Sequence, residues 1–465
     1  MDKKLIRKID SLIVKAQQSK DKGNLKNTIG YLKKILELDP KNEKALNNIG
    51  NAFKELKIYE EALIYYTKAI NINKNYIIAK INLSILYHDL GKLDEAKKIY
   101  SELIELDKYN FAVYFNLSRI DFKYFDESRI KFIKDNIKSD FINNYNKASG
   151  YFVLAKNEQI KKNYKEEMIY LENAHQHFCE SLQPNFYKQS LNYWLNIIPK
   201  KFNKIQFIQN NKTHLDNLRI NPIFITGLPR SGSTLVESII SSGKLRIPNG
   251  GETAIINSTL LQNLRDDLFK KNLENIYIDK TKLSEKIIQK YQNLNLLEKK
   301  NKFFFTDKSL ENFFYIDIII KLFPNAKIIL CKRNIIDNIF AIYQNFFTKM
   351  TWTHSLDNIM NYVDNYLIIL KNTLSKYQNH ILIIELEKLT VDSRDVSKKI
   401  FEFCGLEWTE DSLKYYQRKD LFATTASNIQ IREKIFKYNS LKYKDYKKFI
   451  ENYVKQYSWL EEYFF

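Results

Sequence analysis

The sequence predicts an N-terminal solenoid of paired α-helices followed by a C-terminal α/β domain with a parallel sheet. Three observations support this fold class. Small and aromatic residues recur at a constant spacing in the first part of the chain. Apolar runs of strand length alternate with amphipathic helices after Pro222, which is typical of a parallel sheet covered by helices. A turn that contains glycines follows the first of these runs.

The repeated pattern lies between residues 43 and 110. Its two copies are Gly50, Phe53, Ala62, Tyr66 and Ala69, and then Ser84, Tyr87, Ala96, Tyr100 and Leu103. The offset is 96 − 62 = 34 residues. Small residues let helices cross closely and aromatic rings fill the spaces between crossings, so the pattern predicts stacked units at 43–76 and 77–110, each a pair of antiparallel helices.

Three weaker units extend the solenoid, which is predicted to span residues 1–181. They are a first unit at 9–42, a degenerate unit at 111–144 and a last unit at 148–181. Residues 182–220 are predicted to form a capping helix and a linker. Stacked units of this kind usually present a concave face that binds a peptide or a protein; a plain helical spacer is the alternative.

Composition narrows the classes of protein. No apolar run approaches the ~20 residues of a membrane-spanning helix, and the charged N-terminus lacks a signal core. The three cysteines, Cys179, Cys331 and Cys404, are far apart, which indicates neither a disulfide framework nor a metal site and favours the cytoplasm. The net charge of +20 is spread along the chain; we expect attraction for anionic ligands and acidic acceptors, and no nucleic-acid binding.

The C-terminal domain is predicted over residues 221–465, and its first turn is predicted to bind a phosphate-like anion. Gly227 and Gly232 have the spacing of the two glycines in a phosphate-binding loop. The loop amides and the dipole of the next helix add positive character. A cation and three hydroxyls accompany them: Arg230, Ser231, Ser233 and Thr234. Ser233 stands where a triphosphate-binding loop has Lys. An ordinary strand-to-helix turn is the alternative.

Further strands are expected at 303–306, 327–331 and 381–385, after the first at 223–226, and two of them end in basic residues. Lys308 follows one strand and is suited to stabilise developing negative charge; a strand-end ion pair with Asp307 is the alternative. Arg333 follows another and is suited to bidentate phosphate contact; a plain edge charge is the alternative.

Two loops carry the remaining candidates. Glu252 follows Gly250 and Gly251, and a buried carboxylate on such a turn would be a good general base for a hydroxyl; a solvated helix-start Glu is the alternative. Residues 424–432 contain hydroxyls and an Arg without helix or strand periodicity, so we expect a loop that closes over a ligand. The histidines indicate no metal site, since His175 and His177 are two residues apart and do not face the same side of a helix.

Together these segments resemble the sulfotransferases that use 3′-phosphoadenosine 5′-phosphosulfate (PAPS), in particular bacterial tetratricopeptide-repeat sulfotransferases related to protein-tyrosine sulfotransferases. The resemblance covers about residues 222–460, and the units in front resemble tetratricopeptide repeats. Residues 226–234 match the 5′-phosphosulfate loop of that family, and residues 322–334 match the strand that presents its 3′-phosphate Arg. Residues 401–408 and 426–432 match later segments.

The resemblance implies roles for individual residues. By position, the co-substrate PAPS would be held by Gly227, Pro229, Arg230, Ser231, Gly232, Ser233, Thr234, Arg333 and Arg432. Glu252 would be the base, Lys308 would steady the sulfuryl group and the leaving oxygen, and Ser427 would lie near the transferring group. No metal is implied, because loop N–H groups already supply donors to a sulfuryl group of single charge.

Some positions depart from the family pattern. Ala341 stands where a Ser usually follows the 3′-phosphate Arg, Leu386 stands where a Tyr is common, and Lys442 and Tyr443 replace an Arg-Trp pair. The implied reaction is transfer of a sulfuryl group to an acceptor hydroxyl, with protein or peptide tyrosine favoured over a saccharide or a small metabolite. The alternatives are a P-loop kinase or NTPase, and a repeat scaffold with an inactive sulfotransferase-like domain.

Overall fold

The computed structural model describes residues 3–201, 204–208, 220–268, 275–297, 304–418, 420–421, 428–438 and 444–464. The chain forms two compact units, Met1–Ile142 and Asn143–Phe465. Among the helices in these ranges, none is long and apolar enough to cross a membrane.

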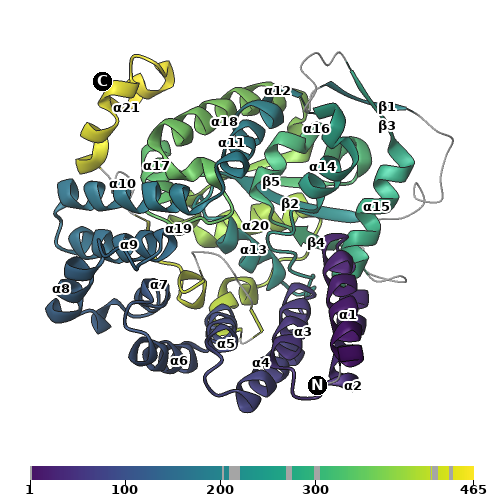
Figure 1. The fold of residues 1–465 in the computed structure, drawn as a ribbon. Helices are drawn as coiled ribbons and strands as arrows, with labels where there is room; N and C mark the ends of the chain where they lie inside the picture. The colour runs from purple at the N-terminus through teal and green to yellow at the C-terminus, as the bar shows by residue number, and fades with distance from the viewer. Residues whose placement is uncertain are drawn as a thin grey trace. The chain divides into compact units, whose positions relative to one another are not determined.

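The first unit is built from helices that, up to α7, each pack against the next along the chain (Figure 1). They are α1 (Lys3–Asp21), α2 (Leu25–Leu38), α3 (Glu43–Glu55), α4 (Tyr59–Ile72), α5 (Ile77–Asp89), α6 (Leu93–Leu106), α7 (Phe111–Ser118) and α8 (Glu127–Asn136). Helices α3 and α5 begin 77 − 43 = 34 residues apart, which confirms the predicted repeat. The side chain of Asn42 accepts a hydrogen bond from the Ala45 amide (2.9 Å) and so caps the start of α3.

The small and aromatic residues of the repeat occupy the expected places. Ala62 and Tyr66 in the first copy, and Ala96 and Tyr100 in the second, are fully buried. A Cβ atom on Gly50 would lie 2.6 Å from the ring of Tyr66, so a larger residue would push the two helices of the unit apart. The repeat is therefore held by close crossings and by aromatic filling.

The second unit begins with another helix pair, α9 (Asn144–Ile160) and α10 (Tyr164–Ser181). The last predicted repeat, 148–181, thus lies in this unit. It is followed by α11 (Pro184–Asn192), one π-helical turn (Tyr193–Ile197) and α12 (Ile198–Lys201). The domain boundaries expected at residues 181 and 220 stay a prediction, because the division into compact units falls earlier in the chain.

All four predicted strands are present in one parallel sheet. They are β2 (Asn221–Gly227), β4 (Phe304–Asp307), β5 (Lys327–Lys332) and β6 (Ile381–Glu385), in the order β4-β2-β5-β6. Two short strands that the sequence pattern did not predict, β1 (Ile205–Ile208) and β3 (Ile276–Asp279), form a separate parallel pair.

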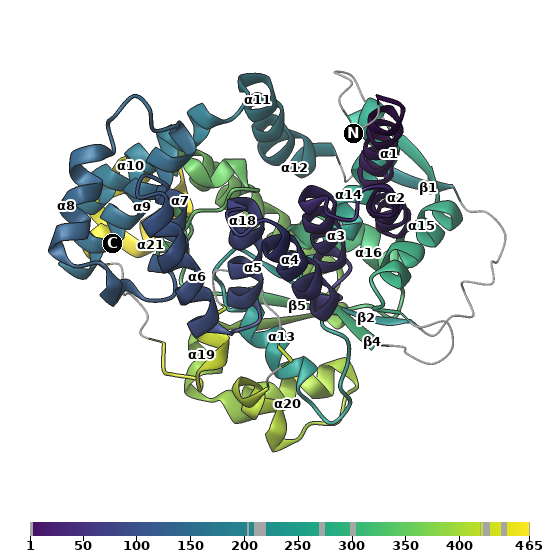
Figure 2. The ribbon, with the colours of Figure 1, turned by 60° about the horizontal axis from the view of Figure 1, so that its bottom comes forward.

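Helices cover both faces of the four-stranded sheet. On one face Ile223 and Ile225 of β2 share a core with α13 (Ser233–Ser241) and α20 (Ser393–Cys404). Phe224 points the other way and its ring meets Phe323, which ends α16 (Ile316–Leu322). Figure 2 shows α13 and α20 on one side of the strands, and α16 and α18 on the other. Both faces of β2 are buried, as its continuous apolar run predicts.

The remaining helices of this unit lie between the strands or after the last strand along the chain. They are α14 (Ile255–Leu268), α15 (Lys280–Asn293), α17 (Ile335–Tyr343), α18 (Leu356–Lys376), α19 (Leu386–Val391) and α21 (Glu461–Phe464). Short 3₁₀ turns include Leu310–Tyr315, Thr351–His354 and Gln430–Arg432.

Strand register brings the candidate residues to one edge. Phe224 of β2 pairs with Asp307 of β4, and Gly227 pairs with Cys331 of β5. The loop after β2, Lys308 after β4 and Arg333 after β5 therefore all follow carboxyl ends of neighbouring parallel strands. Because β4 and β5 lie on opposite sides of β2, this edge is a topological switch point, the usual ligand position in open α/β sheets.

Candidate active site

The glycine loop connects β2 to α13 through backbone angles that only glycine adopts without strain. Gly227 has φ +142°, and a Cβ atom there would lie 2.3 Å from the carbonyl oxygen of Cys331. Gly232 has φ +92° and precedes α13; a Cβ atom there would lie 2.7 Å from Leu386. Arg230 between them also has positive φ, +69°. The loop is therefore a tight, fixed turn that presents its amides at the edge of the sheet.

The hydroxyl groups of this loop are buried. Ser231 is 1% exposed, and its Oγ atom has no hydrogen-bond partner within the described ranges. Ser233 and Thr234 are also buried in the first turn of α13. An unpaired buried hydroxyl is costly, so a ligand with acceptor oxygens would satisfy it. This arrangement fits an anionic group such as a phosphosulfate.

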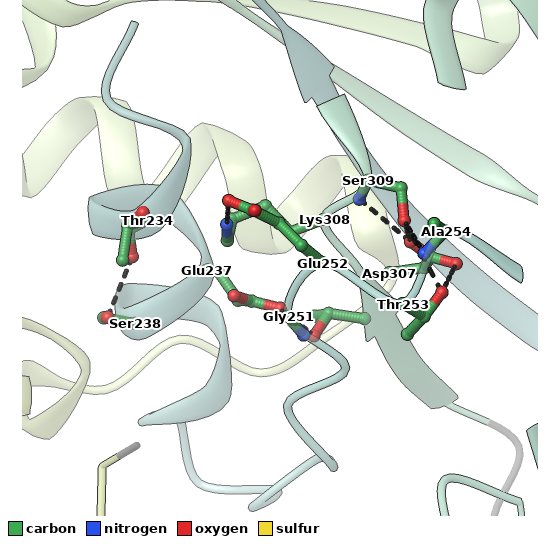
Figure 3. A network of polar contacts seen from close by, with 11 residues as sticks. Thr234, Glu237, Ser238, Gly251, Glu252, Thr253, Ala254, Asp307, Lys308 and Ser309 are labelled. Atoms are coloured by element: carbon green, nitrogen blue, oxygen red, sulfur yellow. Dashed lines mark hydrogen bonds and ion pairs between the residues drawn. The ribbon is translucent and has the colours of Figure 1, made fainter. Parts of the chain in front are cut away.

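Glu252 and Lys308 form an ion pair beside the loop. Lys308 Nζ lies 2.8 Å from Glu252 Oε1, and Figure 3 shows the two side chains meeting between α13 and the end of β4. Burial by itself would lower the pKa of Lys308, but the charges of Glu252 and Glu237 and the hydrogen bond to Glu252 outweigh it, so the pKa is raised. Lys308 is thus a protonated, buried cation.

The expected burial of Glu252 is wrong. Its side chain is 38% exposed, whereas that of Lys308 is 2% exposed. The physical reason is that Glu252 lies in the connection between the Gly250–Gly251 turn and the start of α14 and is itself part of no helix or strand. The alternative of a fully solvated Glu fails as well, because Lys308 holds one of its oxygens. The carboxylate is therefore fixed by a cation and accessible from solvent.

A buried acid, Glu237 of α13, fixes the turn that carries Glu252. Glu237 is 2% exposed. Its Oε1 atom accepts hydrogen bonds from the Gly251 amide (2.9 Å) and from the Thr306 hydroxyl (2.7 Å). A Cβ atom on Gly250 would lie 1.8 Å from the carbonyl oxygen of Thr306, so the turn rests directly on β4. The sequence offered a signal for Glu237 that we missed, a single charged residue inside an otherwise uncharged helix that follows the loop.

A second buried acid, Asp307, ties the same segment to the end of β4. It is 0% exposed and accepts hydrogen bonds from the hydroxyls of Thr253 (2.7 Å), Tyr291 (2.5 Å) and Ser309 (2.6 Å). The Ser309 hydroxyl in turn accepts the amide of Ala254 (2.8 Å). Asp307 is thus a structural acceptor, and the ion pair of Lys308 is with Glu252 instead.

One further carboxyl, Glu311, lies in the same electrostatic cluster. It is buried on the 3₁₀ turn after β4. Burial, followed by the charges of Asp307 and Glu252, raises its pKa to about 7, although Lys308 acts in the opposite direction. No local sequence pattern singles out Glu311, because its environment is set by packing between segments distant in the chain.

Arg333 and Arg230 line one cavity of about 370 Å³. Its other lining residues are Gly232, Leu235, Ala341, Asn345, Leu386, Thr390, Tyr415, Gln430, Ile431, Lys434, Ile435, Phe436, Lys437 and Tyr438. The guanidinium of Arg333 donates to the backbone carbonyl of Arg230 (3.0 Å), and that of Arg230 donates to Gln430 (3.3 Å). Two of the three arginines predicted to contact the co-substrate, Arg230 and Arg333, therefore line one cavity next to the loop.

Other predicted positions have different outcomes. Pro229 is part of the loop, and its carbonyl accepts a hydrogen bond from Asn338 of α17 (2.5 Å). Arg432 is not among the cavity-lining residues; its guanidinium donates to the Leu421 carbonyl (3.0 Å) and to Asn428 (3.2 Å). Its role in binding stays a prediction. Ser427, Lys442 and Tyr443 lie outside the described residues.

The side chains of His175 and His177 have different partners, as expected from their spacing. His175 contacts His354 (Nδ1 to Nδ1, 2.8 Å) in the packing of α10 against the turn Thr351–His354. His177 stacks on Tyr151 instead. In the parts of the chain that the structure describes, no group of three or more His, Cys, Asp or Glu side chains is arranged to hold a metal ion.

Fold and site together define a parallel α/β domain with a glycine loop at the carboxyl ends of its strands, in a chain that begins with helical repeats. Residues 222–410 match the model of the sulfotransferase family. Residues 43–76 and 79–110 match models of the tetratricopeptide repeat. The resemblance drawn from the sequence is therefore confirmed: the chain joins tetratricopeptide repeats to a sulfotransferase-family segment.

Two curated relatives match parts of the chain. An uncharacterized protein of Aquifex aeolicus (strain VF5) is 26% identical over 381 residues, which are 78% of this chain and 47% of that protein. The uncharacterized protein ycf37 of Guillardia theta is 33% identical over 82 residues, 17% of this chain and 46% of that protein. The chain thus spans about half the length of the curated relatives it matches.

Solved structures with partial similarity include proteins of both kinds. The sulfotransferase domain from the curacin biosynthetic pathway is 16% identical (TM-score 0.30; 45% of this chain, 86% of that chain). Sulfotransferase STF1 from Mycobacterium tuberculosis H37Rv is 12% identical (TM-score 0.30; 63% and 92%). A tetratricopeptide repeat protein from Parabacteroides merdae is 14% identical (TM-score 0.30; 69% and 98%).

Proposed function

We propose that this protein transfers a sulfuryl group from PAPS to an acceptor hydroxyl, with protein or peptide tyrosine as the favoured acceptor. The observation that carries the proposal is the Lys308–Glu252 ion pair at 2.8 Å beside a glycine loop. That loop contains a buried Ser231 hydroxyl with no partner in the described ranges. A cation, a base and hydrogen-bond donors for an anion thus lie together at one edge of the sheet.

The loop and the two arginines would hold the co-substrate. PAPS, when bound, supplies an activated sulfuryl group on a 5′-phosphate. The amides and hydroxyls of residues 227–234 are suited to the phosphosulfate end, and Arg333 is suited to a second phosphate because its guanidinium offers paired donors. Arg432 and Ser427 are further candidates by resemblance alone.

The ion pair supplies the chemistry. Glu252 accepts the proton of the acceptor hydroxyl, and the acceptor oxygen forms a bond to sulfur while the bond from sulfur to the 5′-phosphate oxygen breaks. Lys308 stabilises the negative charge that grows on the sulfuryl and leaving oxygens. As Glu252 takes up the proton, its attraction for Lys308 weakens, and the ammonium is then directed to the leaving oxygen. Adenosine 3′,5′-bisphosphate is released.

The acceptor must reach Glu252 from solvent. The 38% exposure of the Glu252 side chain is compatible with a bulky acceptor such as a side chain on a peptide. Concave faces of tetratricopeptide repeats usually bind extended chain segments, which favours a peptide over a saccharide or a small metabolite.

Two measurements test this function. Thermal-shift titration with PAPS and with MgATP should show stabilisation by PAPS; stabilisation by MgATP alone would indicate a kinase or an NTPase. Glu252→Ala and Arg333→Ala should both lower PAPS-dependent transfer. If both variants keep wild-type transfer, the assignment is wrong, and if the wild type does not bind adenosine 3′,5′-bisphosphate, an inactive scaffold is favoured.

A further inference from the structure

Tyr438 lies between the Arg333 guanidinium and a buried carboxylate. Its hydroxyl accepts hydrogen bonds from Nε (3.0 Å) and Nη2 (2.5 Å) of Arg333, and it donates to Oδ2 of Asp337. The Tyr438 amide donates to the Thr390 hydroxyl (3.1 Å), which anchors the backbone at this point. The three side chains form a relay from α17 to the cavity.

The relay determines which donors of Arg333 remain for a ligand. A guanidinium has five N–H groups. Two of them bind Tyr438 and one binds the Arg230 carbonyl. Within the described ranges, the other N–H groups of Arg333 make no hydrogen bond to the protein, and the side chain lines the cavity. Three of its five N–H groups are thus engaged by the protein, and two are left for a ligand.

The hydroxyl also keeps opposite charges apart. Asp337 is 0% exposed, and a buried carboxylate attracts a nearby guanidinium strongly. Burial and the hydrogen bond to Asp337 raise the pKa of Tyr438, so the phenol is neutral and can donate to Asp337 while it accepts from Arg333. Without the Tyr438 hydroxyl, the guanidinium of Arg333 would turn toward Asp337, and the Asp337 carboxylate would neutralise the charge of Arg333.

We propose that Tyr438 is a positioning residue that holds Arg333 ready for the second phosphate of the nucleotide. This inference rests on the proposed function. Ala341 lines the same cavity, but its side chain has no hydrogen-bonding group and cannot hold Arg333 in place. If Tyr438 acts through Arg333, its effect should be confined to ligands that carry the second phosphate.

The test compares two nucleotides by calorimetry on the full chain. Tyr438→Phe should weaken binding of adenosine 3′,5′-bisphosphate about tenfold and leave binding of adenosine 5′-monophosphate unchanged. Tyr453→Phe is the matched control, because it removes another tyrosine–carboxylate hydrogen bond (to Asp357, 2.6 Å) outside the cavity lining. It should change neither affinity.

The remaining outcomes separate this inference from the proposed function. Failure of the wild type to bind the bisphosphate contradicts the function itself. Three outcomes overturn only the role of Tyr438, provided that the wild type binds the bisphosphate. Tyr438→Phe could bind the bisphosphate as well as the wild type does, or more tightly, or it could lose the same factor in affinity for both nucleotides. The double variant Asp337→Asn with Tyr438→Phe should recover part of the lost affinity, since no carboxylate then captures Arg333; no recovery contradicts the relay.

Discussion

The ammonium of Lys308 lies 2.8 Å from a carboxylate oxygen of Glu252, and the two residues differ sharply in exposure, 2% against 38%. Lys308 directly follows β4, an outer strand of the sheet, whereas Glu252 comes from a turn that is held against that strand by Glu237 and Thr306. A fixed buried cation therefore meets a carboxylate that solvent can reach.

Replacement of Lys308 should remove charge stabilisation from the transfer step. Lys308→Met keeps the length of the side chain, and we expect kcat to fall about 10²–10³-fold, as for loss of one donor to a developing oxyanion. PAPS-dependent transfer at saturating substrate measures this. Lys321→Met, which removes an exposed ion pair with Asp317 (2.5 Å) on α16, should leave kcat near the wild-type value. Equal effects of the two variants would contradict a role for Lys308.

Replacement of Glu237 should loosen the turn that carries Glu252. Glu237→Ala leaves the Gly251 amide without its acceptor, so we expect the free energy of unfolding to fall by about 1–3 kcal/mol and kcat to fall as well. Glu237→Gln keeps an accepting oxygen and should restore most of both. Urea unfolding and transfer assays measure the two effects; a loss of kcat in the Gln variant as large as in the Ala variant would show that the charge, and not the position of the turn, matters.

Glu311 should make the protein less stable at alkaline pH. Its pKa is about 7 in the folded state and about 4.3 in an unfolded chain, so the folded state binds more protons between these values. Its stabilising contribution is full below pH ~4.3 and is lost as the pH rises through ~7. Glu311→Gln should therefore raise the free energy of unfolding by up to about 3 kcal/mol at pH 8, and change it little near pH 4.5. An equal effect at both pH values contradicts this.

The buried pair of His175 and His354 should give the opposite dependence. Burial lowers the pKa of both rings, that of His354 to about 4, whereas an unfolded His has a pKa near 6.5. The unfolded state then binds more protons, so this contribution is full above pH ~6.5 and is lost as the pH falls toward ~4.

The difference between variant and wild type isolates this pair from Glu311. The free energy of unfolding is measured for both proteins at pH 7 and at pH 4.5. The decrease between these two pH values should be about 2 kcal/mol smaller for His354→Gln than for the wild type. His380→Gln, which alters a histidine outside the pair, should follow the wild type. Parallel curves for all three proteins would rule out the pair as a source of acid sensitivity.

The sequence predicted the fold because local patterns determine it. The repeat at 34-residue spacing follows from small residues such as Gly50, and the four strands follow from apolar runs bounded by turns. The strands β1 and β3 were missed because each has only four residues, too short for periodicity to distinguish from a linker.

The site was predicted in part for the same reason. The loop glycines and the residues that directly follow strands could be placed, because strand ends converge at one edge. The exposure of Glu252 was predicted wrongly, and Glu237, Glu311 and Tyr438 were not identified. The roles of Glu311 and Tyr438 depend on contacts between segments distant in sequence, such as Tyr438 with Arg333, which no local pattern reveals. The charge of Glu237 in the helix after the loop was a local signal, but its partners Gly251 and Thr306 are also distant in sequence.

The most direct test of the central claim is transfer from sulfur-labelled PAPS to a tyrosine-containing peptide, beside a matched peptide with phenylalanine. We expect wild-type protein to label the tyrosine peptide alone, and Glu252→Ala and Lys308→Met to label it at a few per cent of that rate or less. Transfer of the label from PAPS to another hydroxyl compound would change only the assignment of the acceptor. Absence of any PAPS-dependent transfer, or wild-type rates in both variants, would contradict the account.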